Sequence, residues 1–127
     1  MTDLFLPVTF TFISVLAIAM VPLTGWIGLL RGKLNILRGD GGDRVLFKRI
    51  RIHGNLMENV PLFAIVMAAA ESAGLPANWL WIGILTFLIG RVLHFVLYDS
   101  KLRGVAMFIT VLPGVVMGIW LLMKIWG

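Results

Sequence analysis

The sequence contains no cysteine, and only 13% of its residues are charged. The lack of cysteine excludes disulfides, thiolate metal sites and a cysteine nucleophile, so any thiol chemistry must use a thiol supplied by a ligand. We predict no metal site. A charged fraction this low, beside 60% hydrophobic residues, lies outside the range of ordinary soluble domains. We therefore expect residues 1–127 to form a single integral membrane domain.

Four apolar runs are long enough to cross a bilayer. They predict helices over residues 4–30, 56–73, 79–98 and 105–126, with a basic loop over 31–55. A helix stop and tight turn are predicted at Gly74 to Pro76, and the connection 99–104 is also short. Short connections favour antiparallel neighbours, so the predicted fold is all-α, a four-helix up-and-down bundle. Asp3, with no basic residue before the first run, favours a retained helix over a cleaved signal peptide.

Most of the basic residues fall on one face of this topology. Nine of the eleven lysines and arginines lie in the first and third connections or at their edges: Arg31, Lys33, Arg38, Arg44, Lys48, Arg49, Arg51, Lys101 and Arg103. The positive-inside rule places that face in the cytoplasm and both termini outside. Topology and attraction to anionic membrane lipids account for this charge, so we expect no nucleic-acid partner. The absence of an extended tail or sorting motif favours a bacterial inner membrane.

Polar side chains at membrane depth are costly and usually functional. Here they form two stripes at helical spacing, one on the second predicted helix and one on the third: Arg51, Asn55 and Glu58, and Arg91, His94 and Tyr98. Because one helix leaves the basic face and the other returns to it, both stripes lie at the same depth, so we expect them to line one cavity open to the cytoplasm. The structural alternative is an ion pair between Glu58 and Arg91, with Asn55 and His94 in interhelical hydrogen bonds. The number of polar groups favours a ligand with carboxylates and an amine.

Two segments resemble the signatures of the MAPEG family, the membrane-associated proteins in eicosanoid and glutathione metabolism. Residues 51–62 (RIHGNLMENVPL) resemble the first signature, and residues 90–98 (GRVLHFVLY) resemble the second, at the end of the third helix. The four-helix plan and the long basic first loop also agree, so the resemblance covers essentially the whole chain. It implies a homotrimer, with glutathione sites between adjacent subunits near the cytoplasmic face, and a bacterial member of the family.

The resemblance also implies which residues bind glutathione as a cosubstrate: Arg51, Asn55, Glu58, Arg91, His94 and Tyr98. In this assignment the two arginines suit the carboxylates of glutathione, and Glu58 suits its α-ammonium. The amide of Asn55, the imidazole of His94 and the phenol of Tyr98 supply hydrogen bonds to the ligand. Arg31 is a weaker candidate for a carboxylate contact, and we expect His53 to be structural or exposed.

The catalytic assignment rests on the fourth helix. The resemblance implies a thiol-activating arginine early in this helix, and ungapped counting from Gly90 places Met107 at that position. Arg103, about one turn earlier, is the nearest cation and our candidate for stabilising the thiolate. If it does so, the protein is a glutathione transferase or peroxidase acting on lipophilic electrophiles or lipid hydroperoxides that enter from the bilayer. If it does not, the protein is a non-catalytic membrane scaffold that binds glutathione or an anionic lipid headgroup.

A small multidrug-type transporter is a further alternative, because such proteins also have four short helices. Its essential carboxylate is expected to face a hydrophobic translocation path. Glu58 lies instead beside Arg51 and Asn55 and below a dense basic flank, which disfavours this class.

Overall fold

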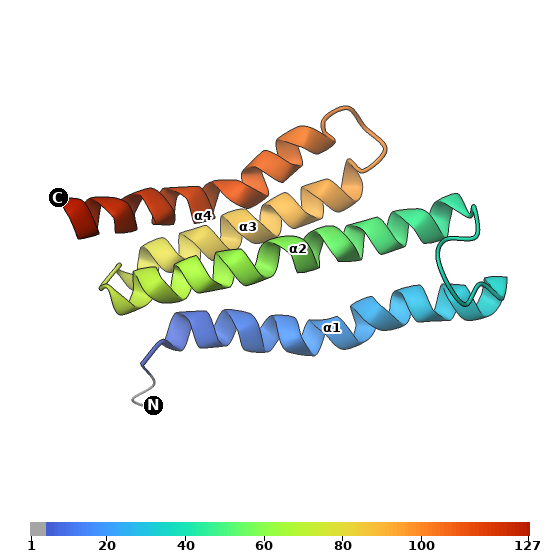
Figure 1. The fold of residues 1–127 in the computed structure, drawn as a ribbon, viewed down its shortest axis with the longest axis horizontal. Coiled ribbons are helices and arrows are strands. Elements are labelled where there is room, and N and C mark those ends of the chain that lie inside the picture. Colours follow the sequence, from blue (N-terminus) through green and yellow to red (C-terminus); the bar gives the residue numbers. More distant parts are fainter. Residues whose placement is uncertain (1–4) are drawn as a thin grey trace.

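The computed structural model describes residues 5–127. Its helices are α1 (Pro7–Leu34), α2 (Arg44–Ser72), α3 (Ala77–Val96) and α4 (Arg103–Trp126). Figure 1 shows them running in alternating directions, with the α1–α2 and α3–α4 connections at one end of the bundle and the start of α1 and the end of α4 at the other. The predicted all-α, four-helix up-and-down bundle is confirmed. We call the two ends the loop end and the turn end, after the short α2–α3 turn at the second.

The start of α2 differs most from the prediction, because this helix begins at Arg44 and not at Leu56. The predicted loop over residues 31–55 is wrong for most of its length, since only residues 35–43 separate α1 from α2. Asp43 caps the helix, and its side chain accepts a hydrogen bond of 2.7 Å from the Leu46 backbone N–H. Hydropathy alone assigned this basic segment to a loop, although lysine, arginine and leucine are good helix formers.

The remaining helix limits lie closer to their predictions. α1 continues to Leu34 beyond the predicted end at residue 30, and its predicted start at Leu4 lies outside the described residues. The predicted turn between α2 and α3 forms at Gly74, which has a φ of +90° that glycine adopts without strain. Across this turn the Leu75 N–H donates to the Ala70 carbonyl at 2.9 Å.

Three of the helices, α1, α3 and α4, are long and apolar enough to cross a membrane. α2 is as long as α1 but falls short in hydropathy, because it carries polar side chains along its length: Asn55, Glu58, Asn59 and Glu71. α2 is therefore more polar than the other three predicted spans. Placing it at membrane depth requires its polar groups to be covered by protein or to line a cavity.

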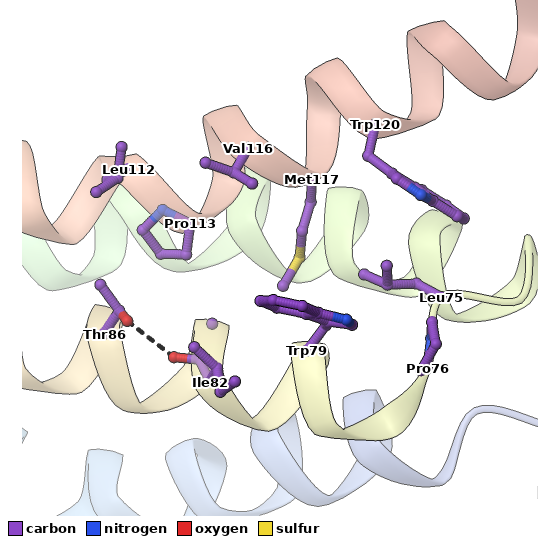
Figure 2. Close-up of a pocket in the computed structure, with 11 residues that line it drawn as sticks. Leu75, Pro76, Trp79, Ile82, Thr86, Leu112, Pro113, Val116, Met117 and Trp120 are labelled. Atoms are coloured by element: carbon purple, nitrogen blue, oxygen red, sulfur yellow. Dashed lines mark hydrogen bonds between the residues drawn. The ribbon is translucent and has the colours of Figure 1, made fainter.

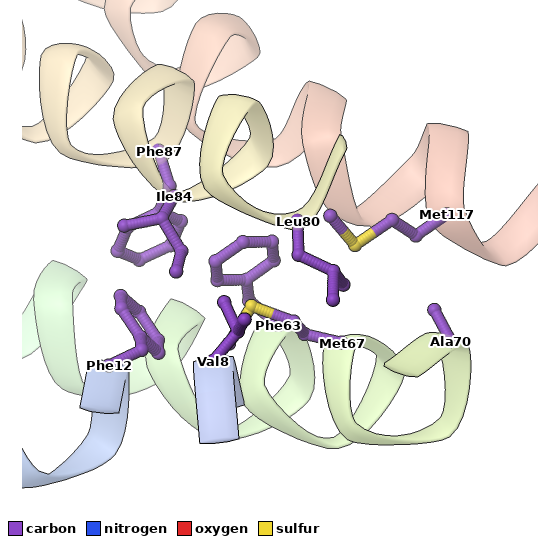
Figure 3. Packing of buried hydrophobic residues seen from close by; sticks show 9 residues of the cluster. All are labelled: Val8, Phe12, Phe63, Met67, Ala70, Leu80, Ile84, Phe87 and Met117. Carbon is purple, nitrogen blue, oxygen red and sulfur yellow. The ribbon is translucent and has the colours of Figure 1, made fainter. Parts of the chain in front are cut away.

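An aromatic cluster joins α1, α2 and α3 (Figure 3). The Phe63 and Phe87 rings are stacked with their centres 4.7 Å apart. Phe12 meets the Phe63 ring edge-on at 5.3 Å. α4 packs against α2 and α3, whereas α1 packs against α2 and α3 and has no close approach to α4 within the described chain. One side of α1 is consequently left without a partner inside the subunit.

The carboxylate of Glu71 ties α1 to α2 at the turn end. It accepts hydrogen bonds from the backbone N–H groups of Val8 at 2.9 Å and Thr9 at 2.8 Å. These donors belong to the first turn of α1, where backbone N–H groups have no partner within the helix and the helix dipole favours a negative charge. Glu71 was not singled out from the sequence, because its partners lie more than sixty residues away along the chain.

Candidate functional site

The stripe on α2 is held together by its own side chains. Arg51 Nη2 donates to Asn55 Oδ1 at 3.3 Å, and Arg51 Nη1 lies 3.7 Å from Glu58 Oε1. This places the three side chains on one face, as their spacing predicts. The Arg51 and Glu58 side chains remain 44% and 61% exposed, so both are accessible to a ligand or to another subunit.

A contact between Asn55 and His94 joins the two stripes. Asn55 Nδ2 and His94 Nε2 are 3.3 Å apart and share a hydrogen bond. His94 is buried, and its ring meets the Tyr98 ring edge-on with the centres 5.7 Å apart. Asn59, which the sequence analysis did not select, donates from Nδ2 to the Asn55 carbonyl at 2.6 Å. The stripes on α2 and α3 therefore meet at one depth in the loop half of the bundle.

Arg91 points to α4 and not to Glu58. Its Nε and Nη2 donate to the Thr110 hydroxyl at 2.9 and 2.7 Å, and Nη2 also contacts Met107 Sδ at 3.0 Å. The ion pair of the structural alternative is therefore absent from residues 5–127, and Arg91 has no carboxylate partner in that part of the chain. A cation at membrane depth without a counter-ion is a preferred position for an anionic ligand group.

Thr110 fixes the position of this guanidinium. Its hydroxyl accepts from Arg91 and donates to the Ala106 carbonyl at 2.9 Å. The side chain is buried where α3 and α4 approach closely, as shown by the 2.6 Å that would separate a Cβ on Gly90 from the Thr110 backbone nitrogen. Sequence reasoning missed Thr110, although a lone hydroxyl within the apolar run 105–126 was an available signal.

Arg103 contacts Tyr98, a residue of the α3 stripe. It is the first residue of α4, and its guanidinium lies 5.4 Å from the centre of the Tyr98 ring. Lys48 lies at the same distance from that ring and forms an ion pair of 2.7 Å with Asp99. A cavity of about 600 Å³ opens at the loop end beside Tyr98, Lys101 and Arg103. Two cationic side chains thus lie over the Tyr98 ring, which also contacts His94.

Arg31, the weaker candidate, and His53, which we expected to be structural or exposed, both have structural contacts. Arg31 Nη1 donates to the Gly39 carbonyl at 2.7 Å and to the Ile36 carbonyl at 3.4 Å, which fixes the α1–α2 loop. His53 Nε2 lies 3.4 Å from the Thr24 hydroxyl and connects α2 to α1. Neither residue is joined to Asn55 or His94 by a hydrogen bond in the described chain. As for metals, residues 5–127 contain no group of three histidine or acidic side chains placed to hold one.

An apolar groove lies between α3 and α4 in the turn half of the bundle (Figure 2). It has a volume of about 410 Å³, and in Figure 2 the Trp79 ring lies below Met117 while Trp120 faces it from α4. Thr86 lines this groove, but its hydroxyl is used locally and donates to the Ile82 carbonyl at 2.9 Å. The groove contains no residue of the two polar stripes.

These features define a class: an all-α membrane protein with a polar site built between two of its helices. The chain matches the MAPEG family over residues 9–123 and belongs to that family. It is 33% identical over 73 residues to the inner membrane protein YecN of Escherichia coli, in strain K12 and in O6:H1 strain CFT073. The match covers 58% of this chain and 56% of each relative, so it spans just over half the length of these relatives. No solved structure matches. Family membership supports a glutathione-related role in a membrane.

Proposed function

We propose that the protein binds glutathione and is a glutathione transferase or peroxidase, acting on lipophilic electrophiles or lipid hydroperoxides that reach it from the bilayer. The hydrogen bond between Asn55 and His94 is the observation that carries this proposal. It brings together two helical stripes whose charges complement those of glutathione, which has two carboxylates and one ammonium group. Membership of the MAPEG family supports the same ligand.

Each charged group of glutathione has a matching side chain in this arrangement. Arg91 has no carboxylate partner within residues 5–127, and Arg51 is partly exposed, so both can pair with carboxylates. Glu58 is the exposed acidic residue of the α2 stripe and suits the α-ammonium. The amide of Asn55 and the ring of His94 are left to orient the backbone of the ligand by directional hydrogen bonds.

Thiol activation is assigned to Arg103. A thiolate is the nucleophile, and a nearby cation lowers the thiol pKa by stabilising the charged form. Arg103 lies against Tyr98, which in turn contacts His94, so it is the cation of α4 next to the site. The first turn of a helix adds a positive dipole at the same place. In conjugation the thiolate attacks an electrophilic carbon and forms a thioether, while a leaving group departs or the adduct takes up a proton. In peroxide reduction the thiolate attacks the terminal oxygen of the hydroperoxide, the O–O bond breaks and an alcohol is released after protonation. A second glutathione then reacts with the resulting sulfenic acid to give glutathione disulfide and water.

The assembly we propose is a homotrimer with the site shared between subunits. Glu58 is 61% exposed in the isolated subunit at a depth where an exposed carboxylate is costly, and a neighbouring subunit would cover it. The site faces the cytoplasm of a bacterial inner membrane, and both termini lie outside. The basic loop end and the two inner membrane relatives support this placement.

The test is an ultraviolet difference spectrum of the purified protein with glutathione at about 240 nm, where a thiolate absorbs, recorded across a pH titration. A saturable band at neutral pH is the expected result, because binding and thiol deprotonation are then coupled. Calorimetry on the same sample measures binding separately. If glutathione does not bind at all, the proposed ligand is wrong.

One observation favours a second function, a non-catalytic scaffold that binds glutathione or an anionic lipid headgroup. Met107 occupies the position at which the family resemblance implies an activating arginine, and its sulfur contacts the Arg91 guanidinium. Binding by calorimetry without a thiolate band near neutral pH would support the scaffold and contradict the enzymatic proposal.

A further inference from the structure

A crevice runs between α1 and α3, over α2, in the loop half of the bundle. Its outer part has a volume of about 480 Å³ and is lined by three cations, Arg44, Lys48 and Arg49. Its inner part, about 210 Å³, has mostly apolar walls, from Leu23, Ile52, Leu56 and Val92, and is also lined by His53, Arg91 and His94. Trp26 and Phe95 line both parts, so the two cavities adjoin at these rings and together form a passage with a charged entrance and a mostly apolar interior.

The entrance carries positive charge that the described chain does not neutralise. Lys48 is paired with Asp99, the acidic residue lining this cavity. Arg49 donates to the Trp26 carbonyl and lies 4.7 Å from the Trp26 ring, contacts that leave its charge uncompensated. The Arg44 side chain forms no hydrogen bond or ion pair within residues 5–127, and the residue is exposed at the rim.

The inner part lies beside the segments of α1 and α3 that are apolar enough to span a bilayer, since Leu23 and Val92 are among its walls. Trp26 and Phe95 separate it from the cations, with their ring centres 5.9 Å apart. Tryptophan commonly marks the boundary between lipid chains and headgroups. The passage therefore crosses that boundary once, with its cations on the headgroup side and its aliphatic walls on the chain side.

We infer that this crevice binds one anionic phospholipid of the leaflet at the loop end. Arg44 and Arg49 hold the phosphate, and one acyl chain lies between α1 and α3 along Leu23 and Val92. The charge at the entrance selects an anionic headgroup, and the mostly apolar walls of the inner part favour an acyl chain. His94, the hydrogen-bond partner of Asn55, lines the inner part of this lipid site, whereas Arg44 and Arg49 belong to neither polar stripe, so the inference does not depend on the proposed function.

The first experiment is native mass spectrometry of the full chain, purified in detergent and mixed with equal amounts of phosphatidylglycerol and phosphatidylcholine. We expect the wild-type protein to retain phosphatidylglycerol preferentially. The variants Arg44→Gln and Arg44→Gln/Arg49→Gln should reduce this preference, by about fivefold for each cation removed. The single variant keeps the Arg49 contacts to Trp26, so it tests the headgroup site even if the double variant fails to fold.

The control variants are Lys33→Gln and Arg38→Gln, which remove cations of the same end that do not line the crevice. Equal losses in these controls would show a diffuse attraction to the basic surface and would overturn the site. Equal retention of the two lipids by the wild-type protein would overturn it as well.

A second measurement locates the acyl chain. The Trp26 contribution to the tryptophan fluorescence is the part that the Trp26→Phe substitution removes. Phosphatidylglycerol brominated on its acyl chains should quench this contribution, and Arg44→Gln should reduce the quenching. If that part of the signal is not quenched in vesicles where phosphatidylglycerol binding is seen, another occupant, such as a second copy of this chain, covers the crevice. That result would overturn the chain position and the inference with it.

Discussion

Arg91 is the residue whose surroundings least resemble what a simple ion-pair interpretation of the sequence predicts. Its guanidinium is held by the Thr110 hydroxyl and touches the sulfur of Met107, both on α4. Glu58 instead pairs with Arg51 on its own helix. The charge of Arg91 is thus positioned by neutral groups and left without a counter-ion in the described chain, which is the state expected of a residue that pairs with a ligand.

Substitutions of the two charged stripe residues test the glutathione site. We expect Arg91→Ala or Glu58→Gln to weaken glutathione affinity at least about tenfold, because each removes one charged partner in a partly desolvated site. Calorimetry measures the affinity. Arg38→Ala, a loop arginine outside the stripes, is the matched control and should leave it unchanged. Unchanged affinity in both site variants would contradict the assignment.

Arg103 should affect turnover more than binding. If it stabilises the thiolate, Arg103→Ala removes an interaction that strengthens as the thiol ionises, so kcat falls while the calorimetric Kd for glutathione changes little. The ultraviolet band should move to higher pH in the same variant. Equal losses in turnover and affinity would make Arg103 a ligand contact without an activating role.

At the scale of the helices, the close approach of α3 and α4 depends on Gly90 of α3. A Cβ at Gly90 would lie 2.6 Å from the backbone nitrogen and 2.8 Å from the Cα of Thr110, neither of which can move without shifting α4. A Cβ at Gly83 would meet the terminal methyl of Met117, which can rotate away. The same close approach places Thr110 against Arg91, so helix packing and site geometry are coupled.

Alanine substitutions at Gly90 and Gly83 should differ in their effect on stability. We expect Gly90→Ala to lower the unfolding free energy by about 1–3 kcal/mol through overpacking. Gly83→Ala should cost less, because alanine favours the helix and Met117 can adjust. Thermal unfolding in one detergent compares the two variants. Equal stability of both would show that α3 and α4 are not in close contact at Thr110.

The cap on α1 is a second feature of this scale. Glu71→Ala removes the acceptor for two backbone N–H groups of α1, and we expect it to lower the unfolding free energy by about 1.5–3 kcal/mol. Glu71→Gln keeps one acceptor oxygen and should have an intermediate effect. Chemical unfolding in detergent gives the difference, with the neighbouring Ser72→Ala as control. A Glu71→Ala variant as stable as this control would exclude the cap.

For the whole molecule, the unpartnered side of α1 and the exposed carboxylate of Glu58 both favour an oligomer. We expect the mass of the protein in nanodiscs, corrected for lipid, to equal that of a trimer. Crosslinking from positions near Glu58 should then connect different subunits. A stable monomer that still binds glutathione would contradict a site shared between subunits.

The sequence by itself determined the membrane class, the four helices and the two polar stripes. These follow from local properties: hydropathy identifies apolar helices, and a period of 3.6 residues places Arg51, Asn55 and Glu58 on one face. Hydropathy failed at the start of α2, because an amphipathic helix that extends beyond the apolar run has the composition of a loop. There the Asp43 cap was the local signal that marked the true start.

The tertiary structure alone decided which groups meet across helices. The Asn55–His94 hydrogen bond, the Arg91–Thr110 contact and the Glu71 cap each join residues of different helices. Such partners depend on the rotation of each helix about its axis and on the distance between axes. Those are fixed by packing at a few positions such as Gly90, and no pattern within one helix encodes them. The lipid crevice has the same origin, since its lining comes from α1, α2 and α3 together.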